Sequence, residues 1–159
     1  MTIAILVEQQ TLKKPPFCTS RTTVFEAAVE IADIDVNALG VVDDDVLVGI
    51  ITDHDIIRCL ADSGPEFSTQ TVGDWMTKRP LTCTPETRLT EALKQMAGRG
   101  IRHLPVLEDG KAETVISSKE LLTRIHENDE LEIGVLRDLA RSGQAANARR
   151  NTDVAPHFP

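Results

Sequence analysis

Tyrosine is absent from this 159-residue chain, and all aromatic residues together make up 3% of it. Proteins that bind bare nucleic acid strands stack the bases on aromatic side chains and neutralise the phosphates with a basic surface. This chain has little of either, because its formal net charge is -8. We therefore expect no nucleic acid polymer as a partner, although a few local cations are enough to hold a small anion.

Cysteines are few and show no metal-binding spacing. Cys18, Cys59 and Cys83 form no CxxC pair and leave an odd number, which predicts neither a disulfide framework nor a zinc site. The apolar run at residues 3–7 is too short to span a bilayer and lacks a preceding cationic flank. We expect a cytoplasmic protein with reduced thiols, without a signal peptide, a membrane segment or a membrane partner.

Catalytic motifs are missing as well. No serine or cysteine stands in a recognisable nucleophile motif, and HExxH, GxGxxG and GxxxxGK do not occur. Cys83 recurs as Cys18 in the repeat described next, which is typical of a small buried packing residue. The acidic turn at residues 43–45 is interpreted as a solvated hairpin tip rather than a Mg²⁺ site. The prediction is therefore no enzyme, no metal site and no required cofactor.

The chain does contain an internal repeat with a shift of 65 residues. The matched pairs include Lys13/Lys78, Pro15/Pro80, Cys18/Cys83, Thr19/Thr84, Thr22/Thr87, Glu26/Glu91, Ala27/Ala92, Leu39/Leu104, Val41/Val106 and Ile51/Ile116. An apolar helical stripe also recurs, with Val24, Ala27, Ala28 and Ile31 matching Leu89, Ala92, Leu93 and Met96. Each half alone would be marginally stable, so the halves must share a core and form clefts between equivalent loops.

Each copy has the same predicted order of elements. In the first copy we expect an extended lead-in at 13–19, a helix at 23–33, strands at 36–42 and 46–51, and a closing helix at 53–61. Asp109-Gly110 predicts a tight antiparallel hairpin in the second copy. The predicted fold is α/β (α+β), with two pseudo-twofold-related β-α-β-β-α repeats packed through their sheets. The predicted parts are 1–66 and 67–127 for the repeats, 128–142 for a C-terminal helix, and 143–159 for a mobile tail.

A polar cluster stands where a strand of the first copy meets its closing helix. In the segment GIITDHD, Thr52 and Asp55 lie together at the start of the helix. One interpretation is helix capping, by Thr52 or by Asp53, with an acid in the first turn. The other is a sugar clamp, because a carboxylate can accept two hydrogen bonds from a ribose diol. The two interpretations are compatible.

A second cluster stands in the second copy, at the start of its first strand. In GIRHLPV, Arg102 and His103 precede an apolar strand. They are either an exposed arginine and a core histidine, or a phosphate-binding pair, for which arginine offers a charged planar fork.

These segments, with the lead-in WMTKRPLTCTPETRLTEAL at 75–93 and the tandem arrangement, resemble the CBS domain family, in particular the tandem pair called a Bateman module. The resemblance covers about residues 11–126. It implies an adenosine-containing ligand such as AMP, ADP or ATP in a cleft between the repeats. The residues it implies for that site are Thr52, His54, Asp55, Thr84, Ile101, Arg102, His103 and Lys119.

Within that site the resemblance also implies separate roles. Asp55 and Thr52 match ribose-binding positions, and Arg102 and His103 match phosphate positions, with His54 and Lys119 as further phosphate contacts. Thr84 and Ile101 match positions that line the adenine. The pseudo-equivalent cleft departs from this pattern, because Glu120 replaces the aspartate and Asn37-Ala38 replace the two cations. We expect one competent site in each chain.

The predicted function is a non-catalytic sensor that binds an adenosine nucleotide and signals to an unidentified effector protein. The alternatives are an S-adenosylmethionine or NAD sensor, and a structural dimerisation module with degenerate ligand sites. The family resemblance further implies a homodimer, with an interface expected at apolar positions of the closing helices: Ile56, Ile57, Leu60, Leu121 and Leu122.

Overall fold

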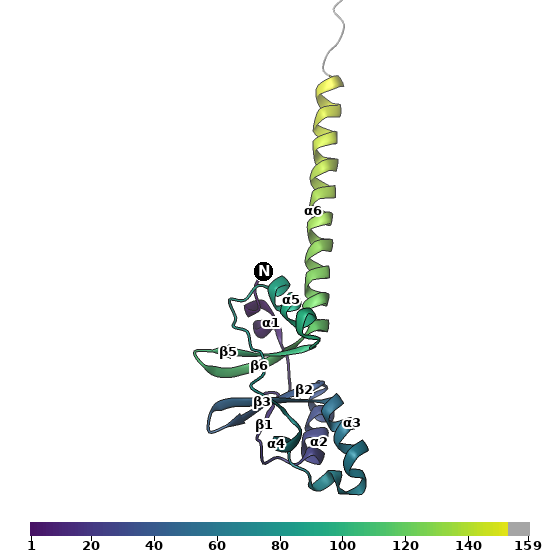
Figure 1. The fold of residues 1–159 in the computed structure, drawn as a ribbon. Coiled ribbons are helices and arrows are strands. Elements are labelled where there is room, and N and C mark those ends of the chain that lie inside the picture. The colour runs from purple at the N-terminus through teal and green to yellow at the C-terminus, as the bar shows by residue number, and fades with distance from the viewer. Residues whose placement is uncertain (153–159) are drawn as a thin grey trace, which may run out of the picture. The chain divides into compact units, whose positions relative to one another are not determined.

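The computed structural model describes residues 1–152, with side chains described as far as residue 138. Residues Met1–Leu121 form one compact unit, and the chain from Leu122 onward forms a second. The first unit contains both repeats (Figure 1). Its elements are α1 Ala4–Gln9, β1 Phe17–Cys18, α2 Val24–Ile34, β2 Ala38–Asp43, β3 Val46–Thr52, α3 Asp53–Ser63, a 3₁₀ helix η1 Gly64–Thr69, α4 Val72–Trp75, β4 Thr77–Lys78, α5 Leu89–Arg99, β5 His103–Glu108 and β6 Lys111–Ser117.

Two small sheets form the centre of this unit. The first has the order β1-β2-β3-β4, with β1 parallel to β2 and the other pairs antiparallel. The second pairs β5 with β6, and Cys83 forms a parallel bridge to Val106 as β1 does to β2. The sheets contact each other through the buried side chains of Ala38, Ile50 and Val115. The predicted fold of two repeats packed through their sheets is confirmed.

Both hairpins turn in two residues. Asp44 and Asp45 connect β2 to β3 with positive φ angles of 48° and 63°, and Asp109 and Gly110 connect β5 to β6 with 50° and 79°. Such turns match the twist of antiparallel strands, which favours aspartate and glycine at these places. The hairpins therefore fix the same register in both repeats.

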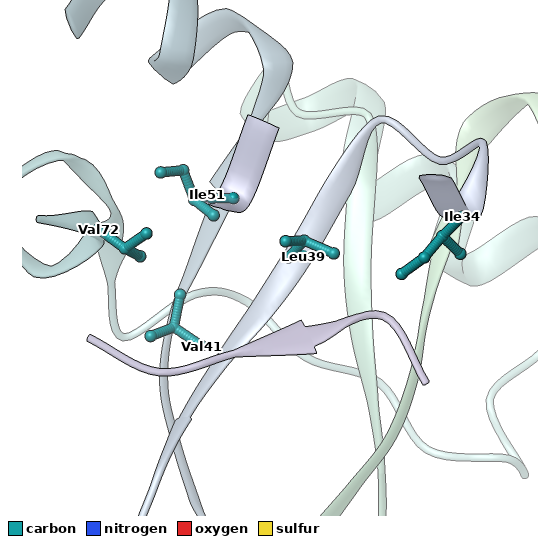
Figure 2. Packing of buried hydrophobic residues seen from close by; sticks show 6 residues of the cluster. Ile34, Leu39, Val41, Ile51 and Val72 are labelled. Atoms are coloured by element: carbon teal, nitrogen blue, oxygen red, sulfur yellow. The ribbon is translucent and has the colours of Figure 1, made fainter. Parts of the chain in front are cut away.

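The segments that precede the repeats are exchanged between them. Ile3 donates its backbone N–H to Thr87 O in the second repeat, whereas Val72 donates its own to Thr22 O in the first. Both side chains are fully buried. Figure 2 shows Val72 beside Val41 and the other residues of the first core. Each repeat thus completes its core with a residue from outside its own helix-and-hairpin segment.

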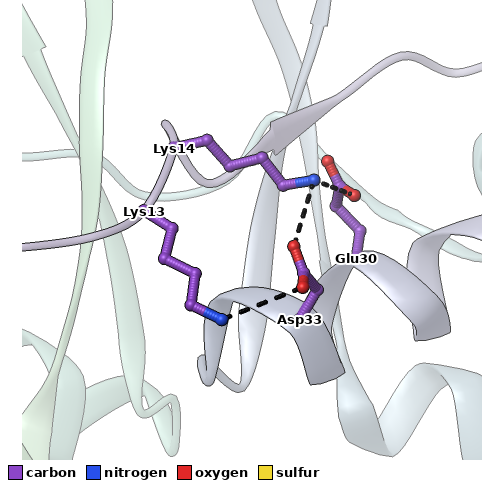
Figure 3. Close-up of polar contacts among 4 residues, drawn as sticks. All are labelled: Lys13, Lys14, Glu30 and Asp33. Atoms are coloured by element: carbon purple, nitrogen blue, oxygen red, sulfur yellow. Dashed lines mark hydrogen bonds and ion pairs between the residues drawn. The ribbon is translucent and has the colours of Figure 1, made fainter.

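The chain returns from the second repeat to the first through residues 10–16. Lys14 Nζ lies 2.7 Å from Glu30 Oε2 and 3.5 Å from Asp33 Oδ2 on α2, and Lys13 Nζ lies 3.9 Å from Asp33 Oδ1 (Figure 3). The hydrogen bond from Lys14 to Glu30 raises the pKa of the Lys14 ammonium. Exposed ion pairs of this kind add little stability, but they hold the crossing segment against α2.

The C-terminal part differs from the predicted division of the chain. A single helix, α6 Ser118–Thr152, covers the expected closing helix, the separate helix at 128–142 and the first ten residues of the expected tail. No proline interrupts this range, and a glycine such as Gly134 costs about 1 kcal/mol in a helix without ending it. Residues 153–159 of the predicted tail lie outside the described residues.

Candidate functional site

Helix α3 begins with a capping box formed by Thr52 and Asp55. The Thr52 hydroxyl accepts a bond from the Asp55 N–H at 3.4 Å, and Asp55 Oδ2 accepts bonds from the Thr52 N–H at 2.9 Å and from its hydroxyl at 3.1 Å. The capping interpretation of these residues is therefore confirmed, with Thr52 as the N-cap. All these bonds use one carboxylate oxygen. The other, Oδ1, receives no hydrogen bond from the described side chains or backbone.

Asp53, the other candidate cap, is the first residue of the helix. Its Oδ1 accepts the His54 N–H at 2.8 Å, and its Oδ2 accepts the Asn37 side-chain amide at 3.1 Å. Its own N–H donates to Asn37 O at 3.0 Å. Both of its oxygens thus have partners within the protein, in contrast to Asp55.

The second cluster lies on the short connection from α5 to β5. Gly100 ends α5 in the left-handed conformation at φ 65°, and the Arg102 carbonyl accepts the Ser118 N–H at 2.8 Å. Arg102 is exposed and His103 is half-buried. Burial lowers the pKa of His103, and Arg102 lowers it further, while Asp53 and Glu120 act in the opposite direction. His103 therefore tends toward its neutral form in the free protein.

The two clusters line one cavity. It has a volume of about 390 Å³, within the range of small-molecule sites. Its lining includes six of the eight sequence-predicted residues: Thr52, His54, Asp55, Ile101, Arg102 and His103. A carboxylate from the first repeat and an arginine and a histidine from the second thus line the same space. We call it the Asp55 cavity.

A second, smaller cavity of about 220 Å³ shares Arg102 and His103 with the first. Lys119, the seventh predicted residue, lines this cavity and not the Asp55 cavity. Thr84, the eighth, is exposed, lines neither cavity, and donates its N–H to the Thr87 hydroxyl oxygen at 3.1 Å. The structure therefore does not place Thr84 with the other candidates.

Five further residues line the Asp55 cavity: Ile50, Thr77, Pro80, Leu81 and Gly100. Ile50 and Thr77 pair across strands β3 and β4. The segment at residues 77–81, which leads from the first repeat to the second, therefore forms part of the wall. The basic, proline-containing sequence Lys78-Arg79-Pro80 could have indicated from the sequence that this segment belongs to the site. The side chains of Ile50, Leu81 and Ile101 make part of the wall apolar.

The cysteines and the acidic turn, which the sequence also singled out, line neither cavity. Burial raises the pKa of Cys18 to about 12 and that of Cys83 to about 11, so both thiols are protonated at neutral pH. In the acidic turn, hydrogen bonds from the side chain and the backbone of Ser20 lower the pKa of Asp43, whose Oδ1 accepts the Ser20 N–H at 3.0 Å. Among the described residues no three histidine, cysteine or acidic side chains converge as metal ligands. Between residues 1 and 152 no helix is both long and apolar enough to cross a membrane.

Two like repeats that pack through their sheets and line one small-molecule-sized cavity define a tandem-repeat module. The sequence model of the CBS domain matches residues 11–62 and 72–127, which is most of the chain. The chain belongs to the CBS domain family, as the resemblance predicted.

Sequence relatives agree with this assignment. The chain is 35% identical over 108 residues to the uncharacterized protein YlbB of Bacillus subtilis, covering 66% of this chain and 72% of that one. It is 33% identical over 120 residues to the mitochondrial CBS domain-containing protein CBSX3 of Arabidopsis thaliana, covering 72% of this chain. The match spans 58% of CBSX3, less than two thirds of its length.

Solved structures share the fold. The CBS-domain containing protein ATU1752 from Agrobacterium tumefaciens superposes with a TM-score of 0.72 at 25% identity, covering 78% of this chain and 98% of its own. The CBS domain pair of protein MJ0100 superposes with a TM-score of 0.68 at 25% identity, covering 81% and 98%. That structure is a complex with 5'-methylthioadenosine and S-adenosyl-L-methionine.

Proposed function

We propose that the chain is a non-catalytic regulatory module that binds an adenosine-containing ligand, of the AMP, ADP or ATP class, in the Asp55 cavity. The observation that carries this proposal is the lining of one cavity by Asp55 of the first repeat and Arg102 and His103 of the second. A carboxylate recognises a diol, and an arginine recognises a phosphate. A nucleotide carries both groups on one ribose.

In this proposal the Asp55 carboxylate accepts hydrogen bonds from the ribose hydroxyls through its Oδ1. Its Oδ2 stays in the capping box, which fixes the orientation of the carboxylate. The phosphate lies toward Arg102 and His103, with His54 beside them in the lining. The apolar wall at Ile50, Leu81 and Ile101 faces the adenine.

Two facts support this ligand class. The cavity of about 390 Å³ suits a small molecule, and the MJ0100 domain pair, which shares the fold, holds two adenosine-containing compounds. S-adenosylmethionine and NAD are alternatives within the same class. Because Arg102 and His103 favour an anionic group, we place nucleotides first.

The absence of catalysis remains part of the proposal. The Asp55 cavity is lined by no cysteine or serine that would serve as a nucleophile, and the buried thiol of Cys83 belongs to the core. Regulation requires binding only, because a ligand stabilises the arrangement of repeats that it prefers. Incubation with ATP should give no turnover above the background rate.

The proposal includes a cytoplasmic homodimer that acts on a separate effector protein. Of the five positions predicted for the interface, Ile57, Leu60 and Leu122 are exposed by 60%, 48% and 53%. Leu121 is fully buried and Ile56 packs against the first core, so these two do not belong to an interface. Phe25 and Val29 of α2 are half-exposed apolar side chains as well.

A thermal-shift panel with AMP, ADP, ATP, S-adenosylmethionine and NAD tests the proposed function. Ligand at 100 times its Kd adds about 2.7 kcal/mol of stability, which corresponds to a rise in Tm of roughly 5–10 °C for a chain of this size. We expect that rise with at least one nucleotide. No rise with any of the five compounds would instead support a structural module with degenerate sites.

A further inference from the structure

Helix α6 continues beyond the compact unit that holds the two repeats. The chain from Leu122 onward forms a separate unit, and between residues 122 and 152 that unit consists of α6 alone (Figure 1). Helices in proteins owe most of their stability to the packing of an apolar face rather than to intrinsic propensity. A helix of this length in a unit of its own therefore indicates a partner from outside that unit.

Apolar side chains recur along this part of α6 and are open to solvent. Five large ones are exposed by 49–69%: Leu122, Leu131, Ile133, Val135 and Leu136. Leu122 and Ile133 are eleven residues apart, which is about three helical turns, so they lie on the same side of the helix. Ile125 and Leu136 have the same spacing, and Leu131 and Val135 are four residues apart. The helix thus has a broad apolar side over residues 122–136.

Charge is divided between the two halves of α6. Residues 118–136 contain five acidic and two basic residues, and residues 137–152 contain one acidic and four basic residues. The formal charges of the two halves are therefore -3 and +3. A second copy of the helix in the antiparallel direction brings each acidic half against the basic half of its partner, whereas a parallel copy brings like charges together.

The needs of a single helix do not explain this division of charge. The helix macrodipole favours acids only in the first turn, and residues 127–132 lie well beyond it. Like charges three residues apart, as in Glu127/Glu130 and Asp129/Glu132, destabilise an isolated helix. Of these four acids only Glu127 has an arginine or lysine partner among the described residues, namely Arg124 at 3.1 Å. The acidic segment is therefore suited to a basic partner.

We infer that α6 forms an antiparallel pair with α6 of a second copy of this chain. The apolar side at 122–136 is the seam of the pair, and the acidic segment at 127–132 of each helix lies against the basic half of the other. The occupant is a second copy because this same helix carries the opposite charge that its acidic half needs. The seam lines neither cavity, so the pair is independent of ligand binding and adds a contact to the homodimer of the proposed function.

Charge reversal in the full chain, followed by analytical ultracentrifugation, tests the pairing. Glu132 is two helical turns after Ile125, on the apolar side, so Glu132→Arg should weaken dimerisation roughly tenfold, because it acts twice in a symmetric pair. Arg149→Glu together with Arg150→Glu should weaken it as well, and all three substitutions together should restore it. Glu113→Arg is the control, since it makes the same charge change at an exposed position of the first unit. A parallel pair would instead be tightened by Glu132→Arg.

A spin label on Thr123→Cys measures the direction of the pair without changing a charge, because Thr123 is exposed and neutral. Pulsed electron paramagnetic resonance should give a distance of about 35 Å or more between the two labels in an antiparallel pair, from a rise of about 1.5 Å per residue. The labelled wild type gives the background from the native cysteines. A short distance of about 10–15 Å, typical of helices in parallel, a monomeric chain, or dimerisation unchanged in Glu132→Arg would overturn the inference. An unchanged dimer would leave the proposed homodimer in place, and AMP titration of Glu132→Arg should match the wild type whether or not the helices pair.

Discussion

Replacement of Asp55 by asparagine separates the capping role of this side chain from its proposed contact with a ribose. The asparagine carbonyl oxygen can still accept the Thr52 N–H and hydroxyl, as Oδ2 does at 2.9 and 3.1 Å. The amide nitrogen, however, takes the place of Oδ1, and it donates where a ribose hydroxyl also donates. The variant should keep the helix cap and lose the sugar contact.

The expected magnitudes follow from these contacts. One hydrogen bond to a charged group is worth about 1.5–3 kcal/mol, so Asp55→Asn should weaken AMP binding roughly 10- to 100-fold. Asp55→Ala should weaken binding to the same extent and also remove the reciprocal half of the capping box, at about 1 kcal/mol of stability. For a chain of this length that is a fall in Tm of about 2–4 °C.

Calorimetric titration with AMP and thermal melts of the free variants measure the two effects. Asp62→Asn is the control, because Asp62 lies exposed on the same helix and the charge change is the same. Its AMP affinity should match the wild type. Equal affinity in wild type and Asp55→Asn, with a loss of stability alone in Asp55→Ala, would show that Asp55 is a capping residue and nothing more.

Other predictions follow from neighbouring features. Arg102→Ala should weaken AMP binding about 10- to 100-fold and leave adenosine binding unchanged, because the guanidinium contacts only the phosphate in the proposed function; Arg99→Ala is the exposed control, and an equal loss for both ligands would contradict the assignment. Because burial lowers the pKa of His103 below its ordinary value of 6.5, the unfolded chain takes up its proton first as pH falls. Chemical denaturation should therefore show stability falling below about pH 6.5 more steeply in the wild type than in His103→Gln, and parallel curves would refute this. Gly49→Ala should cost about 1–3 kcal/mol by pushing β4 aside, whereas Gly98→Ala, with open space around its Cβ position, should be neutral or stabilising by up to about 1 kcal/mol; similar Tm values for the two would contradict the packing. Iodoacetamide at pH 8 should modify Cys18 and Cys83 only after unfolding, since burial raises the pKa of the two thiols to about 12 and 11; mass spectrometry showing rapid modification of the folded chain would be inconsistent with that burial.

The repeated elements could be predicted from the sequence because local signals determine them. The helical stripe beginning at Val24 and the turn at Asp109-Gly110 specify a helix and a hairpin without reference to the rest of the chain. Capping by Thr52 followed from its spacing to Asp55. Six of the predicted site residues line one cavity, because the junction of β3 and α3 in the first repeat and the segment leading into β5 in the second both border it.

The exchange between repeats of the segments that contain Ile3 and Val72 could not be predicted from local signals. Ile3 and Val72 are structural equivalents, yet they lie outside the 65-residue register, so comparing the chain with itself does not align them. The hydrogen bond from Gln10 to Glu120 depends on that exchange, because only a chain crossing between repeats brings residue 10 beside Glu120. Thr84 fails for a related reason, since its position in a motif says nothing of which way its side chain turns.

The length of α6 also lay beyond the sequence signals. The loss of apolar periodicity after residue 142 favoured a tail there, but only a strong breaker such as proline reliably ends a helix. Residues 118–152 contain no proline. A helix boundary predicted from weak signals is therefore less secure than one marked by a cap.

Nuclear magnetic resonance spectra of the uniformly ¹⁵N-labelled chain, recorded during titration with AMP, test the central claim most directly. The account predicts that the backbone signals of residues 52–55 and of residues 101–103 shift together, with one dissociation constant and one ligand per chain. Shifts confined to one of these segments, or none in either, would show that the two repeats do not bind a common ligand.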